Sequence, residues 1–153
     1  MTVFICMRLL PILSEIIDKK TLISALKSMD YSEKEAKNEL EWHLNRVKNL
    51  PETLTGYRIL VVNDKKDINL DEIGSHFSEN KVELLSNHSF CAGCGEKYYL
   101  ITAKIPKKEV DLQEMLRNNI LYPNEYEITV KNKGKNVKIV KIEEINTEND
   151  YFL

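Results

Sequence analysis

The chain has 153 residues, of which 42% are hydrophobic and 30% are charged, and its formal net charge is −2. This length and composition are typical of one ordinary globular domain. The nearly balanced charge gives no reason to expect electrostatic binding to nucleic acid or to an anionic membrane. We therefore expect a single domain over 1–153. The elements described below divide it into a helical segment over 1–50 and a β-rich core over 55–145.

The chain begins with an apolar run, MTVFICMRLLPILSEII. Arg8 and Pro11 interrupt this run and no small-residue cleavage site follows it, so we do not expect a secretory signal peptide. The run is also too short and too interrupted to span a bilayer. We expect a cytoplasmic protein with no membrane partner, in which this segment belongs to the fold.

Two helical regions are predicted in the first third of the chain. Apolar residues recur at helical spacing over 9–29, and Thr21 is a candidate N-cap that would divide this region into two short helices. Ser32 and Glu35 form a capping-box pattern at the start of the next helix, which Pro51 ends. The predicted buried face of that helix consists of Ala36, Leu40, Leu44 and Val47.

The rest of the chain changes to short β-type runs separated by polar turns. The predicted strands cover 57–62, 75–78, 97–105, 125–131 and 135–145, and the helical stretches between them cover 79–87 and 109–120. The last two strands flank Asn-Lys-Gly-Lys, a pattern that favours a β-hairpin. Helices followed by a mixed or antiparallel sheet indicate an α+β fold.

Cys91 and Cys94 form a Cys-x-x-Cys pair in a turn-rich loop. A zinc site needs four ligands, which His76, His88 or Cys6 would have to complete from elsewhere in the chain. A redox pair of the thioredoxin type would lie beside a βαβ pattern, and none is predicted. We favour a tight glycine turn with two thiols, with the zinc half-site as the alternative.

The three histidines differ in their predicted settings. His43 lies in the capped helix and is expected to be exposed or half-buried, whereas His88 belongs to the turn-rich loop. His76 lies in a short strand between Gly74 and Ser78, which is a tighter setting.

Polar side chains interrupt three of the predicted strands. Arg58 lies in an apolar strand, and His76 and Ser78 lie in the strand that follows a glycine. Glu125 and Glu127 are two residues apart, so period-two spacing places both on one face of a late strand. Each feature alone is typical of a solvated strand face. Their order along the chain is what indicates a site.

The segments that carry these residues resemble the motifs of the arginine–serine–glutamate class of ADP-ribosyltransferases, especially its short phage-type members. GYRILVV resembles the strand whose arginine usually follows an aromatic residue, and LDEIGSHFSEN is similar to the G-x-H-W-T form of the middle motif. YYLITAKIPKKEVDLQEML resembles the following strand and short helix, and YPNEYEITV resembles the final Glu-x-Glu motif. The resemblance covers residues 55–142. The middle motif departs from Ser-Thr-Ser, since it reads His76-Phe77-Ser78.

The resemblance implies an NAD-dependent mono-ADP-ribosyltransferase, or an NAD glycohydrolase, with NAD as its cosubstrate. Glu127 would be the catalytic second glutamate, which stabilises the oxocarbenium-like ribose and accepts a hydrogen bond from its 2′-OH. Glu125 would orient or deprotonate the acceptor. The acceptor would be a host protein, or alternatively a nucleic acid, in the cytoplasm of the host cell if a phage encodes the protein.

The remaining motif residues would bind NAD. Arg58 would be a planar bidentate donor to the pyrophosphate or the adenosine ribose. His76 and Ser78 would position the nicotinamide ribose and hold the glutamate, with Phe77 or Tyr57 packed near the base. Two alternatives stay open: an inactive binding module of a phage or mobile element on the same fold, and an interaction domain stabilised by zinc.

Overall fold

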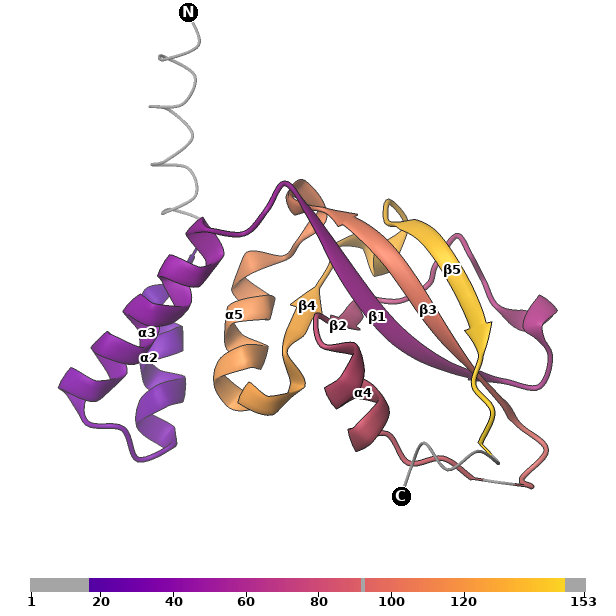
Figure 1. Ribbon diagram of the computed structural model, residues 1–153. Helices are drawn as coiled ribbons and strands as arrows, with labels where there is room; N and C mark the ends of the chain where they lie inside the picture. The colour runs from indigo at the N-terminus through magenta and orange to yellow at the C-terminus, as the bar shows by residue number, and fades with distance from the viewer. Residues whose placement is uncertain (1–16, 92, 148–153) are drawn as a thin grey trace, which may run out of the picture.

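The computed structural model describes residues 17–91 and 93–147. Two helices at the N-terminal end of this part precede a five-stranded antiparallel sheet, and a further helix lies between the helical hairpin and the sheet (Figure 1). The predicted α+β fold is confirmed, and the sheet is antiparallel rather than mixed. The apolar run at the start of the chain and Cys6 lie outside the described residues.

Helix α2 (Lys19–Ser28) begins earlier than the predicted break. The Asp18 side chain accepts a hydrogen bond from the Thr21 backbone amide at 3.1 Å, which makes Asp18 the N-cap. Thr21 is therefore inside the helix, and its predicted role as N-cap is wrong. The earlier part of the helical pattern, 9–16, lies outside the described residues.

Helix α3 (Glu33–Lys48) has the predicted capping box. Ser32 Oγ accepts from the Glu35 amide at 3.2 Å, and the Ser32 amide donates to Glu35 Oε2 at 2.9 Å. The buried face differs from the prediction because His43 is only 6% exposed, whereas Leu44 is half-buried. The expectation that His43 is exposed or half-buried is wrong, since His43 lies on the same buried face of α3 as Ala36, Leu40 and Val47.

The sheet has the strand order β4-β2-β1-β3-β5. Its centre is a long pair, β1 and β3, joined from Thr53↔Pro106 to Val62↔Lys97. Two short strands, β2 and β4, extend it on one side, and β5 follows β3 on the other. The strands are β1 (Thr53–Val62), β2 (His76–Ser78), β3 (Lys97–Pro106), β4 (Glu127–Thr129) and β5 (Lys138–Glu144).

The predicted hairpin between the last two strands is wrong, because β4 and β5 lie at opposite edges of the sheet. The segment between them is a 3-10 turn, Asn132–Gly134, that packs against the loop before β2. The Gly74 amide donates to Lys133 O at 2.9 Å. A Cβ on Gly134 would lie 2.5 Å from Gly74 O, so only glycine allows this approach. The chain therefore passes from one edge of the sheet to the other instead of turning back.

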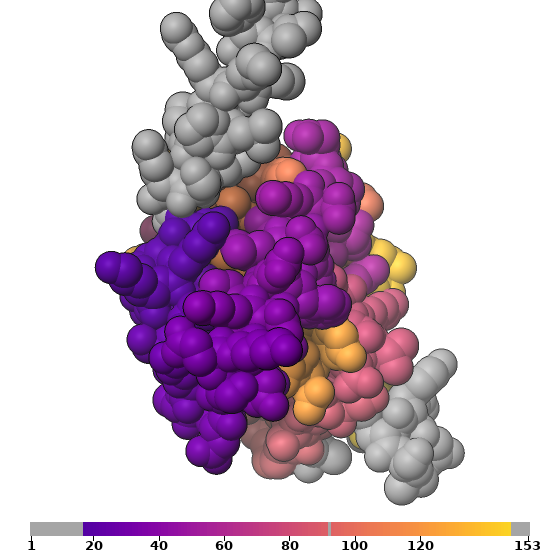
Figure 2. Space-filling model, turned by 90° about the vertical axis from the view of Figure 1, so that its left-hand side faces the viewer, coloured from indigo at the N-terminus to yellow at the C-terminus, as the bar shows by residue number. Residues whose placement is uncertain are grey.

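Helix α5 (Leu112–Leu121) connects the two hydrophobic cores. Met115 belongs to the core beneath the sheet, whereas Leu116 and Ile120 belong to the core shared with α2 and α3. The space-filling view shows the indigo and purple hairpin of α2 and α3 on this side of the molecule, beside orange and pink surface from later parts of the chain (Figure 2). None of the helices in the described part of the chain has the length and apolar character needed to cross a bilayer.

Candidate functional site

A cavity of about 340 Å³ opens beside the short strands β2 and β4. Helix α4 (Lys81–Asn87) forms one wall, and the turn before β4 forms another. All seven residues predicted from the sequence line this cavity: Tyr57, Arg58, His76, Phe77, Ser78, Glu125 and Glu127. They come from three segments of the chain, which form β1, β2, and β4 with the turn before it.

Strand pairing explains why these segments meet. Tyr57 is the Cα partner of Ser78, and Ser78 is the Cα partner of Glu127. Paired residues of antiparallel strands project to the same face, so these three side chains form a row across β1, β2 and β4. His76 and Thr129 are also Cα partners and form the next row on that face.

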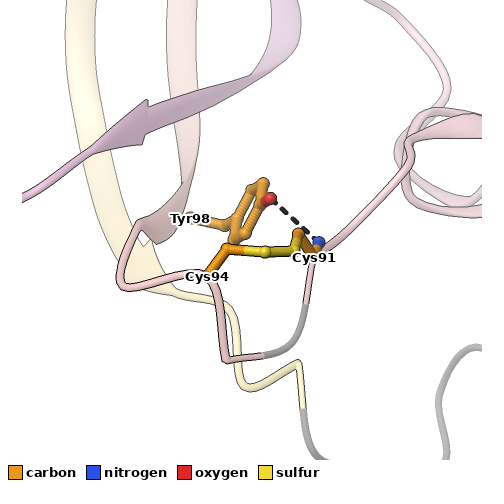
Figure 3. The surroundings of a disulfide bond; sticks show 3 residues. All are labelled: Cys91, Cys94 and Tyr98. Atoms are coloured by element: carbon orange, nitrogen blue, oxygen red, sulfur yellow. Dashed lines mark hydrogen bonds between the residues drawn. A yellow bond between two sulfur atoms is a disulfide. The ribbon is translucent and has the colours of Figure 1, made fainter.

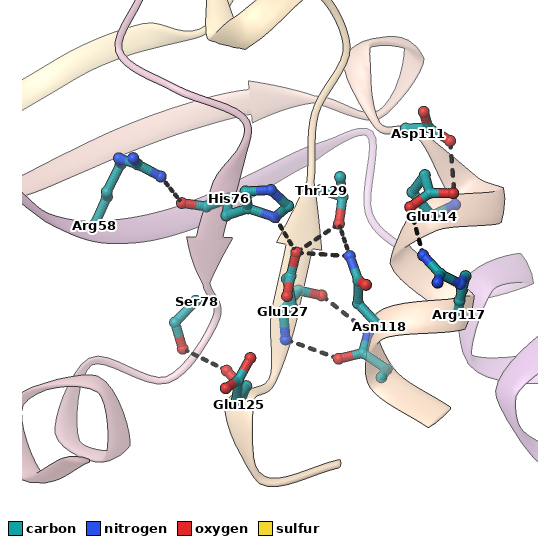
Figure 4. A network of polar contacts seen from close by, with 11 residues as sticks. Arg58, His76, Ser78, Asp111, Glu114, Arg117, Asn118, Glu125, Glu127 and Thr129 are labelled. Atoms are coloured by element: carbon teal, nitrogen blue, oxygen red, sulfur yellow. Dashed lines mark hydrogen bonds and ion pairs between the residues drawn. The ribbon is translucent and has the colours of Figure 1, made fainter. Parts of the chain in front are cut away.

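Glu127 is 8% exposed, and its carboxylate is held through one oxygen. Its Oε1 accepts from Thr129 Oγ1 at 2.8 Å, from Asn118 Nδ2 at 2.9 Å and from His76 Nδ1 (Figure 4). None of the described residues donates to Oε2. Because an ionised carboxylate only accepts hydrogen bonds, His76 Nδ1 is the donor in this contact.

Three residues that contact Glu127 were not predicted from the sequence. Thr129 and Asn118 hold its carboxylate, and Asn119 pairs with its backbone. The only signal in the sequence is a pair of asparagines, which are weak helix formers, inside a predicted helical stretch.

The prediction that both glutamates share one strand face is wrong. Strand β4 begins at Glu127, whereas Glu125 ends a 3-10 turn and Tyr126 turns the chain with left-handed angles, φ 49° and ψ 47°. Glu125 is exposed and Glu127 is buried, although both line the cavity. Ser78 Oγ holds this turn, since it lies within hydrogen-bonding distance of Glu125 O at 3.1 Å (Figure 4).

The Arg58 side chain leaves β1 on the face opposite to Tyr57 and reaches the start of β2. Its Nη1 donates to His76 O at 2.8 Å, and its buried Nε has no partner among the described residues. Burial lowers the pKa of Arg58, because desolvation disfavours the charged guanidinium. Gly74, with φ +113°, packs against this group, and a Cβ there would lie 2.6 Å from Arg58 Cζ.

The two aromatic residues have different positions in the site. Phe77 is 3% exposed and belongs to the hydrophobic core beneath the sheet. Tyr57 lies in the row with Ser78 and Glu127, on the opposite face of the sheet. Tyr57 is therefore the better placed of the two to contact a base in the cavity.

The Cys91–Cys94 loop lies beyond α4 and contains a disulfide between these two residues (Figure 3). The expectation of two free thiols is therefore wrong. The Cys91 amide donates to Tyr98 Oη at 2.9 Å, and the Tyr98 ring lies 5.8 Å from that of His88, a cavity residue. Within 17–91 and 93–147, no group of three or more His, Cys, Asp or Glu side chains is arranged to hold a metal ion.

This arrangement suits the stabilisation of positive charge on a small ligand. Glu127 is a fixed and mostly buried carboxylate, and an electrostatic interaction is stronger in such a buried setting than in water.

Comparisons of the chain with protein-family models, curated proteins and solved structures found no match in any of the three.

Proposed function

We propose that this protein is an NAD-dependent ADP-ribosyltransferase that cleaves the nicotinamide–ribose bond and transfers ADP-ribose to a macromolecule. With water as the acceptor, the same site would act as an NAD glycohydrolase. One observation carries the proposal: the arginine, histidine–serine and Glu-x-Glu segments that resemble the family line a single cavity, although they are far apart in sequence. They do so because β1, β2 and β4 are neighbours in the sheet.

Glu127 has the surroundings that the proposed chemistry needs. As the bond between C1′ and the nicotinamide nitrogen breaks, its electron pair leaves with nicotinamide and positive charge develops on the ribose. A fixed carboxylate beside the ribose stabilises that charge without reorganising. Three hydrogen bonds at Oε1 hold Glu127 in this way and leave Oε2 for the substrate.

The cavity fits the nicotinamide riboside end of NAD better than the whole dinucleotide. Its volume of about 340 Å³ is at the lower end of the roughly 300–1,000 Å³ that is usual for ligand sites. In the proposed complex the Tyr57 ring, which lines the cavity, packs on the nicotinamide ring. Arg58 also lines the cavity, and in the proposed complex its guanidinium would donate to phosphate or ribose oxygens.

Glu125 is placed to receive the acceptor. It is exposed at the cavity, and Ser78 holds its backbone. In the proposed reaction the acceptor forms a bond to C1′ and its proton passes to Glu125 or to solvent. The two glutamates thus have different roles: Glu125 takes part in this proton transfer, whereas Glu127 stabilises the charge on the ribose.

The proposal is tested by nicotinamide release from NAD and by transfer of labelled ADP-ribose to proteins of a cell lysate. Glu127→Gln keeps the shape and removes the charge, so we expect the rate of nicotinamide release to fall by roughly a hundredfold or more. Glu144→Gln, on the opposite edge strand β5, is the matched control and should leave the rate unchanged. An equal rate in wild type and Glu127→Gln would refute the proposal.

The same variants separate transfer from hydrolysis. Glu125→Gln should reduce labelling of acceptors more than it reduces nicotinamide release, because Glu127 still stabilises the ribose. Binding of NAD with no nicotinamide release in the wild type would instead favour a binding module on this fold.

A further inference from the structure

Two adjacent asparagines on α5 reach the strand that carries Glu127. Asn119 is 4% exposed, and its carboxamide forms two hydrogen bonds with the Glu127 backbone. Nδ2 donates to Glu127 O at 2.9 Å, and Oδ1 accepts from the Glu127 amide at 2.8 Å. Since β4 is an edge strand, Asn119 satisfies backbone groups that a neighbouring strand would otherwise pair.

Asn118 contacts the side chain of Glu127 instead of its backbone. Asn118 Nδ2 donates to Glu127 Oε1 at 2.9 Å and to Thr129 Oγ1 at 3.2 Å, and Thr129 Oγ1 donates to the same carboxylate oxygen at 2.8 Å (Figure 4). The threonine hydroxyl has one proton, so accepting from Asn118 leaves that proton for Glu127. These contacts form a closed ring of hydrogen bonds at Oε1.

Helix α5 is a rigid base for this contact. Met115 is 1% exposed in the core beneath the sheet, and Leu116 and Ile120 are 2% and 3% exposed in the core shared with the helical hairpin. Packing on both sides opposes rotation or sliding of the helix. Side chains carried by such an element hold their partners more accurately than side chains on loops.

We propose that Asn118 is a positioning residue for Glu127. By occupying Oε1 together with Thr129, Asn118 turns Oε2 towards the cavity, where it faces the ribose. His76 also binds Oε1, but its side chain is 62% exposed. The less exposed contacts that fix the carboxylate therefore come from Asn118 on α5 and Thr129 on β4. The role of Asn118 in catalysis rests on the proposed function, whereas its contact with Glu127 does not.

The kinetic test compares variants in α5 and β4. Asn118→Ala should lower kcat for nicotinamide release by about 10–100-fold, with KM little changed, because a misplaced carboxylate affects the transition state more than substrate binding. Thr129→Val keeps the side-chain shape and should lower kcat in the same way. Arg117→Ala, at an exposed neighbouring position on α5, is the control and should have no effect.

A double-mutant comparison separates positioning from a general loss of structure. If Asn118 acts through Glu127, Asn118→Ala should have no further effect on kcat in a Glu127→Gln background. A full additional loss in that background, or a raised KM with unchanged kcat, would overturn the proposal.

A second measurement does not depend on NAD cleavage. In ¹H–¹⁵N spectra, the side-chain amide signals of Asn118 should shift in Glu127→Gln and stay in place in Glu125→Gln. Unshifted Asn118 signals in Glu127→Gln would overturn the positioning contact, whatever the activity. Shifted signals in a protein that cleaves no NAD would support the contact and refute the proposed function.

Discussion

Replacing Gly74 with alanine tests how closely the site depends on the Arg58 guanidinium. Gly74 has φ +113°, which alanine adopts with strain, and its added Cβ would lie 2.6 Å from Arg58 Cζ. Gly95 is a matched control, because it has φ +80° and no atom within 4 Å of an added Cβ. Gly95→Ala therefore carries a backbone cost without a steric clash.

The expected losses follow from these two terms. The left-handed backbone costs about 1–2 kcal/mol, and overpacking against Arg58 adds about 1–3 kcal/mol. Gly74→Ala should thus lower the free energy of unfolding by about 2–5 kcal/mol, and Gly95→Ala by only about 1–2 kcal/mol. For a chain of this length each kcal/mol corresponds to about 2–4 °C in Tm.

Thermal and urea unfolding measure this difference directly. The excess cost of Gly74→Ala should disappear when Arg58→Ala removes the guanidinium, because the clash is then absent. Nicotinamide release should also fall in Gly74→Ala, since Arg58 Nη1 holds the His76 carbonyl at 2.8 Å. Equal unfolding costs for Gly74→Ala and Gly95→Ala, or fully additive costs with Arg58→Ala, would refute this reasoning.

Two further predictions concern α3. Arg46 Nη2 lies 2.5 Å from Glu79 Oε2, and the two side chains are 27% and 29% exposed. Arg46→Ala should lower the free energy of unfolding, measured in urea, by about 1–2 kcal/mol, because this pair is partly screened by solvent. Lys37→Ala removes an exposed pair on the same helix and should change the free energy of unfolding little. Burial lowers the pKa of His43 below 6.5, so the unfolded state binds more protons and the free energy of unfolding should fall as the pH decreases from about 6.5. His43→Gln should reduce this acid dependence, and an unchanged dependence would contradict the buried position.

Local features of the fold were predictable from neighbouring residues. The capping box of Ser32 and Glu35 formed as predicted, because its hydrogen bonds join residues three apart. The strands β1 and β3 were recognisable from their β-branched and aromatic residues, although β1 begins four residues before the predicted start at Tyr57. The α+β class follows from the order of these elements.

Part of the candidate site was also predictable. The motif resemblance selected Tyr57, Arg58, His76, Ser78 and Glu127 one segment at a time, and the structure brings them to one cavity. The resemblance included the start of α5 but did not indicate that α5 contacts Glu127, because a helix that supports a strand from outside leaves no spacing pattern in the strand itself.

The remaining features depend on contacts between distant parts of the chain. The Asn-Lys-Gly-Lys turn suits a hairpin locally, but β4 pairs with β2 and β5 pairs with β3, so the packing of Gly134 on Gly74 prevails. His43 is buried because it lies on the face of α3 that packs against the rest of the fold, together with Ala36, Leu40 and Val47. The sequence by itself determined which segments form helices and strands and which polar residues they carry. Only the tertiary structure decided that Glu127 is buried, that Glu125 is exposed, and that Asn118 holds one carboxylate oxygen, because burial and side-chain contacts depend on which distant segments pack together.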